Sequence, residues 1–419
     1  MSVTIRHYIQ QVKNMCHYIF PIIGVLRYGM MGNKISIIGI TGTDGKSSSV
    51  ILTASMLRAH GHKVAHYSSI SFHDGDTEFP NTMKMTTPGR MKLHRFLYQA
   101  YKNGCTHAVI EVTSQGIMQH RHRFIGFSLI GITNITPEHI EAHGGFYNYK
   151  KTKLSLISQL KKTGSYGLVI DDETYTVNQA QIPSSVTVTT VCVGDNTLFA
   201  SEIIEEGVHT STVAITQRAQ RVLIQSSLGG PFITHNIIFA TTIAILYGVP
   251  LRDISEAVIS HAHIPGRFEI VKRTPLVIVD YAHTINALTR ILQFVRAHTK
   301  GKVVHVFGAA GGGRDRYKRP LIAELSEQYT DTSILTEENS FDEPIERILA
   351  DIQKGFSKTH NVHVIPHRED AFDFALSLLD DGDTLLLTAK GSETVIAGPK
   401  GSKRAYTERS YIQHVSNDF

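Results

Sequence analysis

The sequence predicts an α/β protein with two domains, each built on a mostly parallel sheet. Over roughly the first 260 residues, apolar strand-like runs alternate with amphipathic helix-like stretches, which is the pattern of a parallel sheet with crossover helices. The pattern breaks around Ile264-Pro265-Gly266-Arg267, and a second α/β series follows it. A glycine-rich turn, Gly39 to Ser47, lies between the first apolar run and a helix-like stretch, and is the third observation.

The first series contains the elements of a central domain. We expect strands at 35–40, 63–69, 107–112, 127–134 and 167–171, and helices at 48–60, 90–103 and 147–161. The stretch 186–226 contains short β segments, such as Ser185 to Cys192 and Val222 to Ile224, and predicts an appended antiparallel sheet. After Gly229-Gly230-Pro231 we expect a helix at 233–247.

The second series contains the elements of a C-terminal domain. We expect strands at 275–280, 302–308, 332–336, 362–366 and 383–388, and helices at 284–298, 319–329, 343–356 and 368–379. We therefore divide the chain into a short N-terminal segment, 1–33, a central domain, 34–264, and a C-terminal domain, 265–419.

The N-terminal segment imitates a signal peptide, because it is apolar from Tyr18 to Met31 and follows basic residues such as Arg6 and Lys13. Its longest uninterrupted apolar run is only about ten residues, Pro21 interrupts it, and no small-residue cleavage site follows. We therefore expect a helix that docks on the central domain.

The composition is that of a globular enzyme from a reducing compartment. The chain has 419 residues, 42% of them hydrophobic, which is enough to bury a sizeable core. The three cysteines, Cys16, Cys105 and Cys192, are too far apart for a disulfide framework or a metal cluster, so we expect a cytoplasmic protein. The net charge of +5 comes without a clustered Lys/Arg stripe, which argues against nucleic-acid binding and favours an acidic or phosphorylated small-molecule substrate.

The most informative segment is Gly39-Ile40-Thr41-Gly42-Thr43-Asp44-Gly45-Lys46-Ser47. Strand, glycine-rich turn, lysine, hydroxyl and helix in this order are typical of triphosphate binding. The glycines let backbone N–H groups and the helix N-terminus point at phosphate oxygens, Lys46 neutralises charge, and the Ser47 hydroxyl ligates Mg²⁺. Gly39 lies one residue earlier than the strict G-x-x-x-x-G-K-[ST] pattern requires, so the loop is a variant. The alternative is a glycine-rich surface turn with an incidental lysine.

Two further groups of polar residues follow strand-like runs. Glu111 ends the run at 107–112, where a Walker-B-like acid would hold Mg²⁺, although a carboxylate there can also merely solubilise a loop. The segment from Thr133 through His139 continues to several lysines, including Lys153. His139 is a candidate second metal ligand, whereas a lone loop histidine is more often structural.

These segments resemble the Mur ligase family, and most closely its UDP-N-acetylmuramoyl-tripeptide synthetase branch. The variant loop matches that family's Gly-x-x-Gly-Thr-x-Gly-Lys-[Thr/Ser]. Other matching segments are Glu111-Val112-Thr113-Ser114-Gln115-Gly116, Thr133-Asn134 through His143 to Lys153, Asn236, Asp280-Tyr281-Ala282-His283-Thr284, Gly308 to Pro320, and Lys390-Gly391-Ser392-Glu393. The resemblance covers residues 34–415 and keeps the family's order.

The resemblance implies a P-loop central domain, a Rossmann-like C-terminal domain, and an ATP-dependent ligase of peptidoglycan precursor synthesis and cell wall biogenesis. Such an enzyme joins a carboxylate to an amino acid through an acyl phosphate. The implied catalytic and metal-binding residues, for two Mg²⁺ ions and with Lys153 carbamylated, are Lys46, Ser47, Glu111, His139 and Lys153. The implied ATP-binding residues are Gly42, Thr43, Gly45, Lys46, Ser47, Asn236, Asp280 and His283. The implied substrate-binding residues are Thr86, Thr87, Thr113, Gln119, Arg121, Arg314, Glu338, Asn339 and Glu393.

Three departures from the family pattern bear on the substrates. Members that add diaminopimelate carry Asp-Asn-Pro-Arg, whose arginine clamps a carboxylate, whereas this chain has Glu338-Asn339-Ser340-Phe341. Phe341 cannot hold a carboxylate and Glu338 favours a cationic group, so we expect a lysine-like acceptor. Gln115 and Ser392 replace two family histidines. The segment 1–33 is expected to replace the uridine-nucleotide-binding domain that members of this branch carry before the phosphate loop.

The carboxylate substrate therefore has two interpretations. It is UDP-MurNAc-L-Ala-D-Glu held without that domain, or it is another carboxylate, as in the folylpolyglutamate and cyanophycin synthetase branches. A protein that binds ATP without ligating, such as a partner subunit, is a third hypothesis, although a relic has no reason to keep Lys46, Glu111, His139 and Lys153. We expect small-molecule partners, no integral membrane segment, and a monomer.

Overall fold

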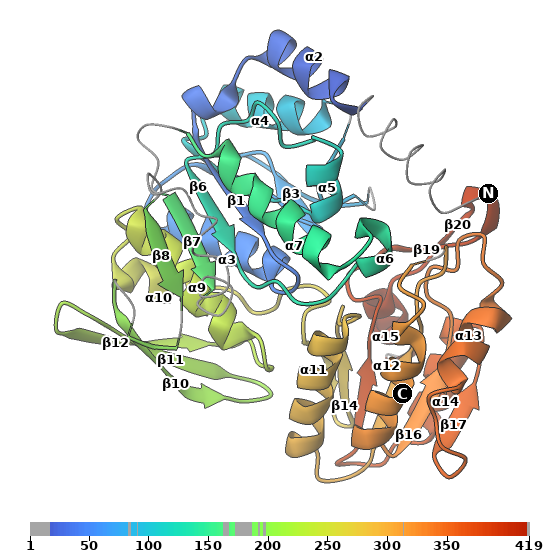
Figure 1. Ribbon diagram of the computed structural model, residues 1–419. Helices are drawn as coiled ribbons and strands as arrows, with labels where there is room; N and C mark the ends of the chain where they lie inside the picture. Colours follow the sequence, from blue (N-terminus) through green and yellow to red (C-terminus); the bar gives the residue numbers. More distant parts are fainter. Residues whose placement is uncertain are drawn as a thin grey trace.

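The structure is a computed structural model that describes residues 17–82, 85–89, 91–161, 167–171, 187–191, 193–195, 198–312 and 314–416. It consists of two α/β bodies that lie side by side, with a small antiparallel sheet attached to the first (Figure 1). The predicted α/β class is confirmed, and the division that we place at 264/265 falls between the two bodies' sheets.

The central body is built on a sheet with the strand order β4-β3-β2-β5-β1-β6-β7-β8. Its strands are β1 (Ser36–Thr41), β2 (Val64–Tyr67), β3 (Ser71–His73), β4 (Glu78–Pro80), β5 (His107–Glu111), β6 (Leu129–Ile132), β7 (Gly167–Asp171) and β8 (Val188–Val191). The strands from β2 to β8 in this order pair in parallel, and β3 and β4 add an antiparallel edge. The five strands predicted for the first series are confirmed.

One β segment differs from the prediction. We expected 185–192 in the appended antiparallel sheet, but β8 pairs in parallel with β7 and extends the central sheet. Thr189 and Val191 point from β8 into buried positions. A short Val/Thr-rich run fits either sheet locally, so the packing of its buried face decides the partner. Cys192 itself lies outside the described residues.

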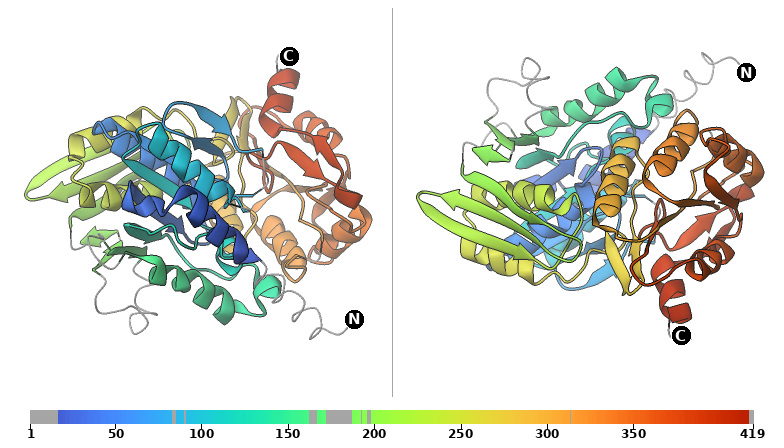
Figure 2. Two further views of the ribbon diagram at one scale, coloured as in Figure 1. Left: turned by 90° about the horizontal axis from the view of Figure 1, so that it is seen from above. Right: turned by 90° about the horizontal axis from the view of Figure 1, so that it is seen from below.

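Helices cover both faces of the central sheet (Figures 1 and 2). The helices of this body are α2 (Ile19–Tyr28), α3 (Lys46–Ala59), α4 (Lys92–Lys102), α5 (Ser114–Met118), α6 (Ile140–His143), α7 (Phe146–Leu154), α9 (Ile233–Leu246) and α10 (Leu251–Ile259), with the 3-10 turns η1 (Met31–Asn33) and η2 (Ser155–Gln159). Successive residues of β1 enter opposite cores: Ile38 packs in the core that contains α3, α9 and α10, and Ile37 in the core that contains α4.

The helical predictions for this body are confirmed with one adjustment. The helix expected at 147–161 ends as α7 at Leu154 and continues as the 3-10 turn η2. The N-terminal segment forms α2, which packs against α4 as expected of a docking helix. Within the described part of the chain, no helix is both long and apolar enough to span a bilayer.

The appended sheet has the order β12-β11-β10-β9 and lies against α9 and α10. Its strands are β9 (Gly194–Asp195), β10 (Ala200–Glu206), β11 (Ser211–Gln217) and β12 (Gln220–Ser226), all antiparallel. Val213 and Ile215 of β11 are fully buried in the same core as α3, which joins this sheet to the central body.

The C-terminal body is a sheet with the order β13-β14-β18-β15-β16-β17 between two layers of helices. Its elements are β13 (Glu269–Arg273), β14 (Leu276–Val279), α11 (Ile285–His298), β15 (Val303–Phe307), α12 (Lys318–Tyr329), β16 (Thr332–Leu335), α13 (Ile345–Gln353), β17 (Asn361–Val364), α14 (Arg368–Ser377), β18 (Thr384–Leu387), β19 (Val395–Ala397), the turn η4 (Pro399–Gly401), β20 (Lys403–Ala405) and α15 (Glu408–Ser416). All nine elements predicted for the second series are confirmed. The additions are the antiparallel edge strand β13, the short β19 and β20 pair, and α15.

Candidate active site

A cavity of about 520 Å³ lies between the two bodies and receives side chains from both. It is lined by the ends of β1, β5, β14 and β15 and by the segments that follow them. The predicted site residues that line it are Gly42, Thr43, Gly45, Lys46, Ser47, Thr86, Glu111, Thr113, Gln119, Arg121, His139, Lys153, Asn236, Asp280, His283, Arg314, Glu338, Asn339 and Glu393. Residues that lie far apart in the sequence therefore share one space, as ligand sites at the carboxyl ends of parallel strands do.

The glycines of the phosphate loop have positions that a side chain would disrupt. Gly45 has φ +79° at the start of α3, and a Cβ there would lie 2.5 Å from Asn236 Oδ1. A Cβ on Gly42 would lie 1.9 Å from Thr133 Oγ1. The backbone consequently turns tightly enough for the N-terminus of α3 to face the cavity, which is the arrangement that binds phosphate.

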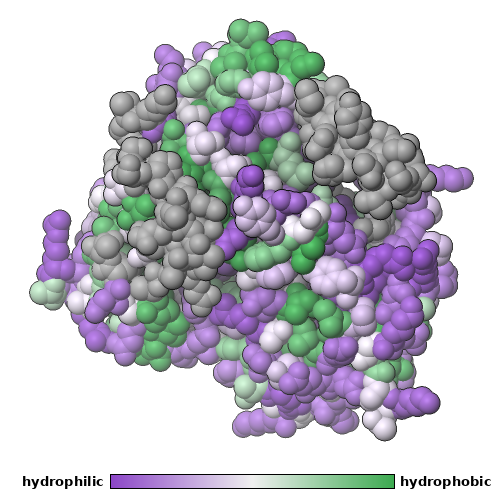
Figure 3. All heavy atoms as spheres, in the orientation of Figure 1, coloured by the Kyte–Doolittle hydropathy of each residue, from purple (hydrophilic) through white to green (hydrophobic). Residues whose placement is uncertain are grey.

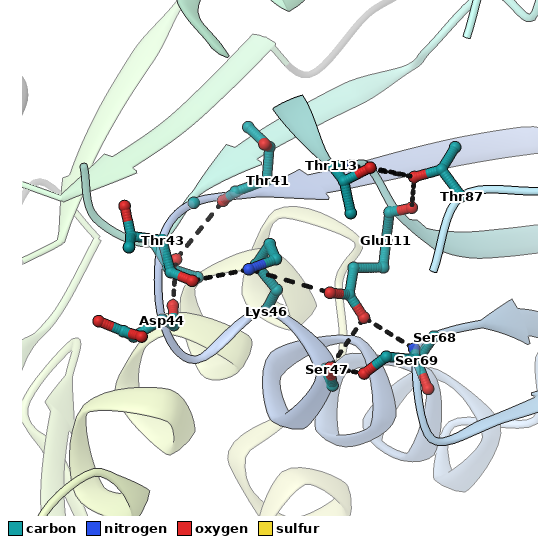
Figure 4. A network of polar contacts seen from close by, with 12 residues as sticks. Thr41, Thr43, Asp44, Lys46, Ser47, Ser68, Ser69, Thr87, Glu111 and Thr113 are labelled. Carbon is teal, nitrogen blue, oxygen red and sulfur yellow. Dashed lines mark hydrogen bonds and ion pairs between the residues drawn. The ribbon is translucent and has the colours of Figure 1, made fainter. Parts of the chain in front are cut away.

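Glu111 and the start of α3 form one polar group (Figure 4). Parallel pairing of β1 with β5 sets Glu111 level with Ile40, just before the loop. The Ser47 hydroxyl donates to Glu111 Oε2 at 2.8 Å, the backbone N–H of Ser69 donates to the same oxygen at 2.9 Å, and Lys46 Nζ lies 4.0 Å from Oε1. A hydroxyl and a carboxylate oxygen side by side are ligands that suit Mg²⁺, and Lys46 adds positive charge beside them.

A second group of potential metal ligands spans the two bodies. Glu138, His139 and Asp315 place ligand atoms within 4.8 Å of one another. The backbone N–H of His139 donates to Asp315 Oδ2 at 2.9 Å, and Lys318 Nζ lies 2.8 Å from Glu138 Oε1. Burial raises the pKa of Glu138 to about 7, against the lowering effect of Lys318. Desolvation in the cavity wall lowers the pKa of His139 to about 3, so the imidazole is neutral and able to bind a metal.

Sequence reasoning selected His139 but assigned no metal role to Glu138 or Asp315. Glu138 is adjacent to His139 and was visible as a motif residue, whereas Asp315 lies 176 residues away in the C-terminal body. No local pattern connects two segments at that separation, and only the contact between the bodies brings them together.

Lys153 is buried beneath the phosphate loop. Its side chain is 2% exposed, its Nζ donates to the carbonyl oxygen of Gly42, and it lies 4.7 Å from the centre of the Tyr149 ring. Burial first, and the nearby Lys46 second, hold its pKa well below the usual lysine value, although Asp44 and Glu111 oppose the shift. A solvated helix lysine, the alternative that the sequence allowed, is excluded.

The segment after β5 carries the side chains predicted to hold the carboxylate substrate. The Arg121 guanidinium donates to the carbonyl oxygen of Thr87 and to Gln119 Oε1. Thr87 is only 1% exposed and does not line the cavity; its hydroxyl donates to Glu111 O at 3.1 Å and accepts from Thr113 N–H at 2.9 Å. Thr87 was expected to bind substrate; in the structure its hydroxyl contacts the backbone of Glu111 and Thr113, and the side chain lies outside the cavity wall.

Asp280 and His283 follow β14 and combine structural contacts with a place in the cavity wall. The carboxylate of Asp280 accepts from the backbone N–H groups of Phe268 and Ala282, both at 2.6 Å, and so fixes the loop after β14. The ring of His283 contacts the carbonyl oxygen of Tyr281 through Nδ1 at 2.9 Å, and burial holds its pKa well below the usual value.

We use the term C-domain pocket for the part of the cavity lined by Arg314, Glu338, Asn339, Phe341 and Glu393. Asn339 is its centre: its amide donates to Glu393 Oε2 at 2.9 Å and to Glu338 Oε1 at 3.1 Å, and its oxygen accepts from the backbone at Ala397. The guanidinium of Arg314 lies 4.9 Å from the centre of the Phe341 ring. Burial, and then the charge of Glu393, raises the pKa of Glu338.

Lys390 also supports this pocket, although the sequence did not mark it as a site residue. Its ammonium group lies 2.6 Å from Glu393 Oε2 and donates to the carbonyl oxygen of Val395 at 2.8 Å, while the side chain is fully buried. The Lys390-Gly391-Ser392-Glu393 motif already contained the signal, since its first and last residues are an i, i+3 pair of opposite charge.

Polar contacts hold the two bodies together across the cavity. The Thr284 hydroxyl donates to both carboxylate oxygens of Asp44, at 3.2 and 3.3 Å, and Lys318 donates to the carbonyl oxygen of His283 as well as to Glu138. Burial raises the pKa of Asp44, which Lys46 and Thr284 oppose. The phosphate loop is thus joined directly to the C-terminal body.

Comparison with known families identifies both bodies. The model of the Mur ligase middle domain matches residues 40–244, and that of the Mur ligase glutamate ligase domain matches residues 266–391. The UDP-N-acetylmuramoyl-L-alanyl-D-glutamate–2,6-diaminopimelate ligase of Caldanaerobacter subterraneus is 32% identical over 371 residues, which are 88% of this chain and 75% of the relative. The enzyme of the same name from Aquifex aeolicus is 29% identical over 389 residues, 93% of this chain and 79% of the relative.

Solved structures agree. A UDP-N-acetylmuramoyl-L-alanyl-D-glutamate–2,6-diaminopimelate ligase superposes with a TM-score of 0.61 at 25% identity, covering 92% of this chain and 78% of the other. Mycobacterium tuberculosis folylpolyglutamate synthase with ADP has a TM-score of 0.69 at 17% identity, covering 87% of this chain and 90% of the other, and shares the fold. The sequence and the structure together show that this chain belongs to the Mur ligase family of ATP-dependent, peptide-forming ligases.

Proposed function

We propose that this protein is a Mur ligase that joins the carboxylate of UDP-MurNAc-L-Ala-D-Glu to the amino group of an amino acid at the expense of ATP, in peptidoglycan precursor synthesis. One observation carries the proposal: the phosphate loop, both groups of metal ligands and the C-domain pocket line a single cavity. The relatives whose names contain this substrate support it. We expect a monomer that acts in the cytoplasm.

The cavity supports a reaction in two steps. A carboxylate oxygen of the substrate attacks the γ-phosphorus of ATP, the bond to the β,γ-bridging oxygen breaks, and ADP leaves an acyl phosphate behind. The amine of the amino acid then attacks the acyl carbon, loses a proton, and phosphate departs as the amide forms. Lys46 and the N-terminus of α3 offset the negative charge of the phosphoryl groups during the first step.

Magnesium fits the two groups of ligands. We assign one ion to Ser47 and Glu111 and a second to His139 with a carbamylated Lys153; the carboxylates of Glu138 and Asp315 lie within 4.8 Å of the His139 ligand atom and so beside this second ion. Bound Mg²⁺ supplies positive charge that lowers the repulsion between two anionic reactants. The polypeptide itself excludes water: the contacts between the two bodies keep water away from the acyl phosphate.

The position of Lys153 supports the proposed carbamate. A protonated amine would repel a cation, whereas the lowered pKa leaves a neutral, nucleophilic amine beside the carbonyl oxygen of Gly42. Addition of CO₂ converts that amine into a carboxylate-like ligand and releases one proton. Carbon-13 bicarbonate should therefore give a carbamate NMR signal that Lys153→Ala abolishes. The exposed Lys151 of the same helix offers the matched control, and Lys151→Ala should keep the signal.

For the acceptor we propose a lysine-like amino acid with a cationic side chain. This chain has Phe341 where the Asp-Asn-Pro-Arg pattern has its clamping arginine, and Glu338 adds a buried acid to the same pocket. A cationic group near Glu338 would also favour ionisation of that carboxyl, whose pKa is raised without a ligand.

ADP release by the purified chain tests the proposal. The assay contains Mg²⁺ and ATP, with and without UDP-MurNAc-L-Ala-D-Glu, and with lysine, diaminopimelate or glutamate as acceptor. Turnover that requires both the UDP-dipeptide and lysine is the expected result, and a clear preference for diaminopimelate would overturn the acceptor assignment. Turnover only with a carboxylate that lacks UDP would point to a folylpolyglutamate-like substrate instead. ATP binding without turnover for any pair would favour a non-catalytic subunit.

A further inference from the structure

Helix α2 presents an apolar face that the described part of the chain leaves uncovered. Ile19, Ile22, Ile23 and Leu26 repeat at intervals of three and four residues, so they lie on one side of the helix. Their exposed fractions are 56%, 37%, 42% and 80%, respectively. Figure 3 shows the resulting apolar surface at the top of the molecule, over α2.

The opposite side of α2 is held against the central body and cannot rotate to bury these side chains. Gly24 packs so closely on α4 that a Cβ would lie 2.8 Å from the ring of His94. The rings of Tyr28 and Tyr98 lie 5.4 Å apart, and the backbone N–H of Gly32 donates to the carbonyl oxygen of Ile125 at 2.9 Å. Among the residues that the structure describes, none therefore covers this apolar face.

The sequence around this face carries positive charge and almost no negative charge. Helix α2 itself contains Arg27 and no Asp or Glu. Helix α4, on which α2 packs, contains three cations, Lys92, Arg95 and Lys102, and no acid. From 79 to 137 the single acidic residue is Glu111, which is buried in the active site. The exposed apolar stripe of α2 thus lies beside the cations of α2 and α4.

We propose that the face formed by Ile19, Ile22, Ile23 and Leu26, with the cations of α2 and α4, docks on an anionic lipid bilayer. An amphipathic helix of this kind lies in the plane of the interface, with its apolar side chains among the acyl chains and its cations at the lipid head groups. With ten residues, α2 is too short to span the bilayer, and no other described helix is both long and apolar enough to do so.

A second copy of the chain fits this face less well than a bilayer does. Symmetric pairing would bring two cationic surfaces together, and like charges repel. Four side chains on a ten-residue helix also fall short of the roughly 800 Å² per partner that a stable dimer buries. An anionic bilayer, in contrast, offers both acyl chains for the apolar residues and negative charge for the cations.

Docking would place one end of the cavity near the lipid. The ring of Tyr18, just before α2, lies 5.0 Å from that of His120 and 5.8 Å from that of Phe124. Those residues belong to the same segment as Gln119 and Arg121, which line the cavity. If the proposed function is right, a docked enzyme would therefore receive its carboxylate substrate at the membrane surface.

Sedimentation of the full chain with lipid vesicles tests the docking surface independently of ligase activity. We expect binding to vesicles of phosphatidylcholine with about 40% phosphatidylglycerol, and roughly tenfold weaker binding to pure phosphatidylcholine or in about 0.5 M salt. The double variant Ile22→Glu/Leu26→Glu should bind the anionic vesicles roughly tenfold more weakly than the wild type. Arg27→Gln/Arg95→Gln should lose binding mainly at low salt.

The matched control places the same substitutions on exposed apolar residues elsewhere. Leu223 of β12 and Ile259 of α10 are 51% and 55% exposed, so Leu223→Glu/Ile259→Glu should bind vesicles as the wild type does. Thermal unfolding of each variant, measured without lipid, shows whether it is folded. The proposal is overturned if the wild type does not bind anionic vesicles, or if Ile22→Glu/Leu26→Glu and Leu223→Glu/Ile259→Glu bind them equally well. It is also overturned if light scattering finds a dimer that only Ile22→Glu/Leu26→Glu dissociates.

Discussion

The phosphate loop and the C-domain pocket occupy the same cavity but are built differently. In the phosphate loop the backbone forms the site. At Gly42 and Gly45 a Cβ would lie too close to the side chains of Thr133 and Asn236, so only glycine fits there. In the C-domain pocket the side chains make the site, through the amide of Asn339 and the ring of Phe341. A site made of backbone tolerates little change, whereas a site made of side chains can change its ligand by substitution. This difference explains why the loop matches the family and the pocket departs from it.

The largest effect is expected from Gly45→Ala. A Cβ would lie 2.5 Å from Asn236 Oδ1, and the φ of +79° disfavours alanine. Displacement of the loop by such a contact should weaken ATP binding and ligation roughly 100-fold, as measured by calorimetry and ADP release. Gly61→Ala is the control, because Gly61 has a similar φ of +87° with nothing within 4 Å. Equal losses in the two variants would mean that backbone strain alone, not the contact, shapes the loop.

Next in size is Asn339→Ala. The backbone N–H of Ala397 and the carboxylates of Glu338 and Glu393 would all lose a buried partner. We expect the free energy of unfolding to fall by about 2 kcal/mol and KM for the amino acid to rise, with little change in ATP affinity. Asn361→Ala, which removes one hydrogen bond on the edge strand β17, is the comparison and should cost much less. A large loss of ATP affinity in Asn339→Ala would contradict the separation of the two regions.

A smaller effect is expected from Lys318→Gln, which acts between the two regions. Lys318 lowers the pKa of Glu138 that burial has raised to about 7. Without this charge the pKa rises further, so the Glu138 carboxylate forms only at higher pH. The acid limb of the pH profile of kcat/KM should move upward by about one unit, and activity near pH 7 should fall roughly fivefold.

The exposed Lys354 provides the control for that experiment, because it pairs with Asp351 on the surface. Lys354→Gln should leave the pH profile in place. A shift of equal size in both variants would show that general charge, rather than the pair with Glu138, sets the profile.

The smallest effect on total activity, and the sharpest on selectivity, is expected from Phe341→Arg. The new guanidinium would offer a bidentate partner to a distal carboxylate, so the preference for lysine over diaminopimelate should fall roughly tenfold. Phe341→Leu removes the ring without adding charge and should lower activity for both acceptors alike. Competition between the two amino acids in one assay measures the ratio directly. An unchanged ratio in Phe341→Arg would mean that the pocket does not select the acceptor.

Most of the fold was predictable because its elements carry local signals. Apolar alternation and glycine punctuation located the parallel strands of both bodies other than β8, and the helix that follows the phosphate loop. The short elements escaped prediction: β3, β4, β13, β19 and β20 are strands of three to five residues at or near a sheet edge, or in the separate two-stranded sheet. A strand of three to five residues is too short to show a clear alternation of apolar and polar residues, so its pairing with the neighbouring strands decides its structure. The strand β8 was misassigned for the same reason.

The sequence by itself determined the family, the phosphate loop, and the residue types available for phosphoryl transfer, since these follow from motifs within single segments. Only the tertiary structure decided which of these residues act together. It buried Lys153 against the carbonyl oxygen of Gly42, turned the Thr87 hydroxyl to the backbone of Glu111, brought Asp315 to His139, and left the apolar face of α2 exposed among the described residues. The physical reason is that burial, pKa and contacts across the cavity arise from segments more than 100 residues apart or on different elements, and no local pattern records them.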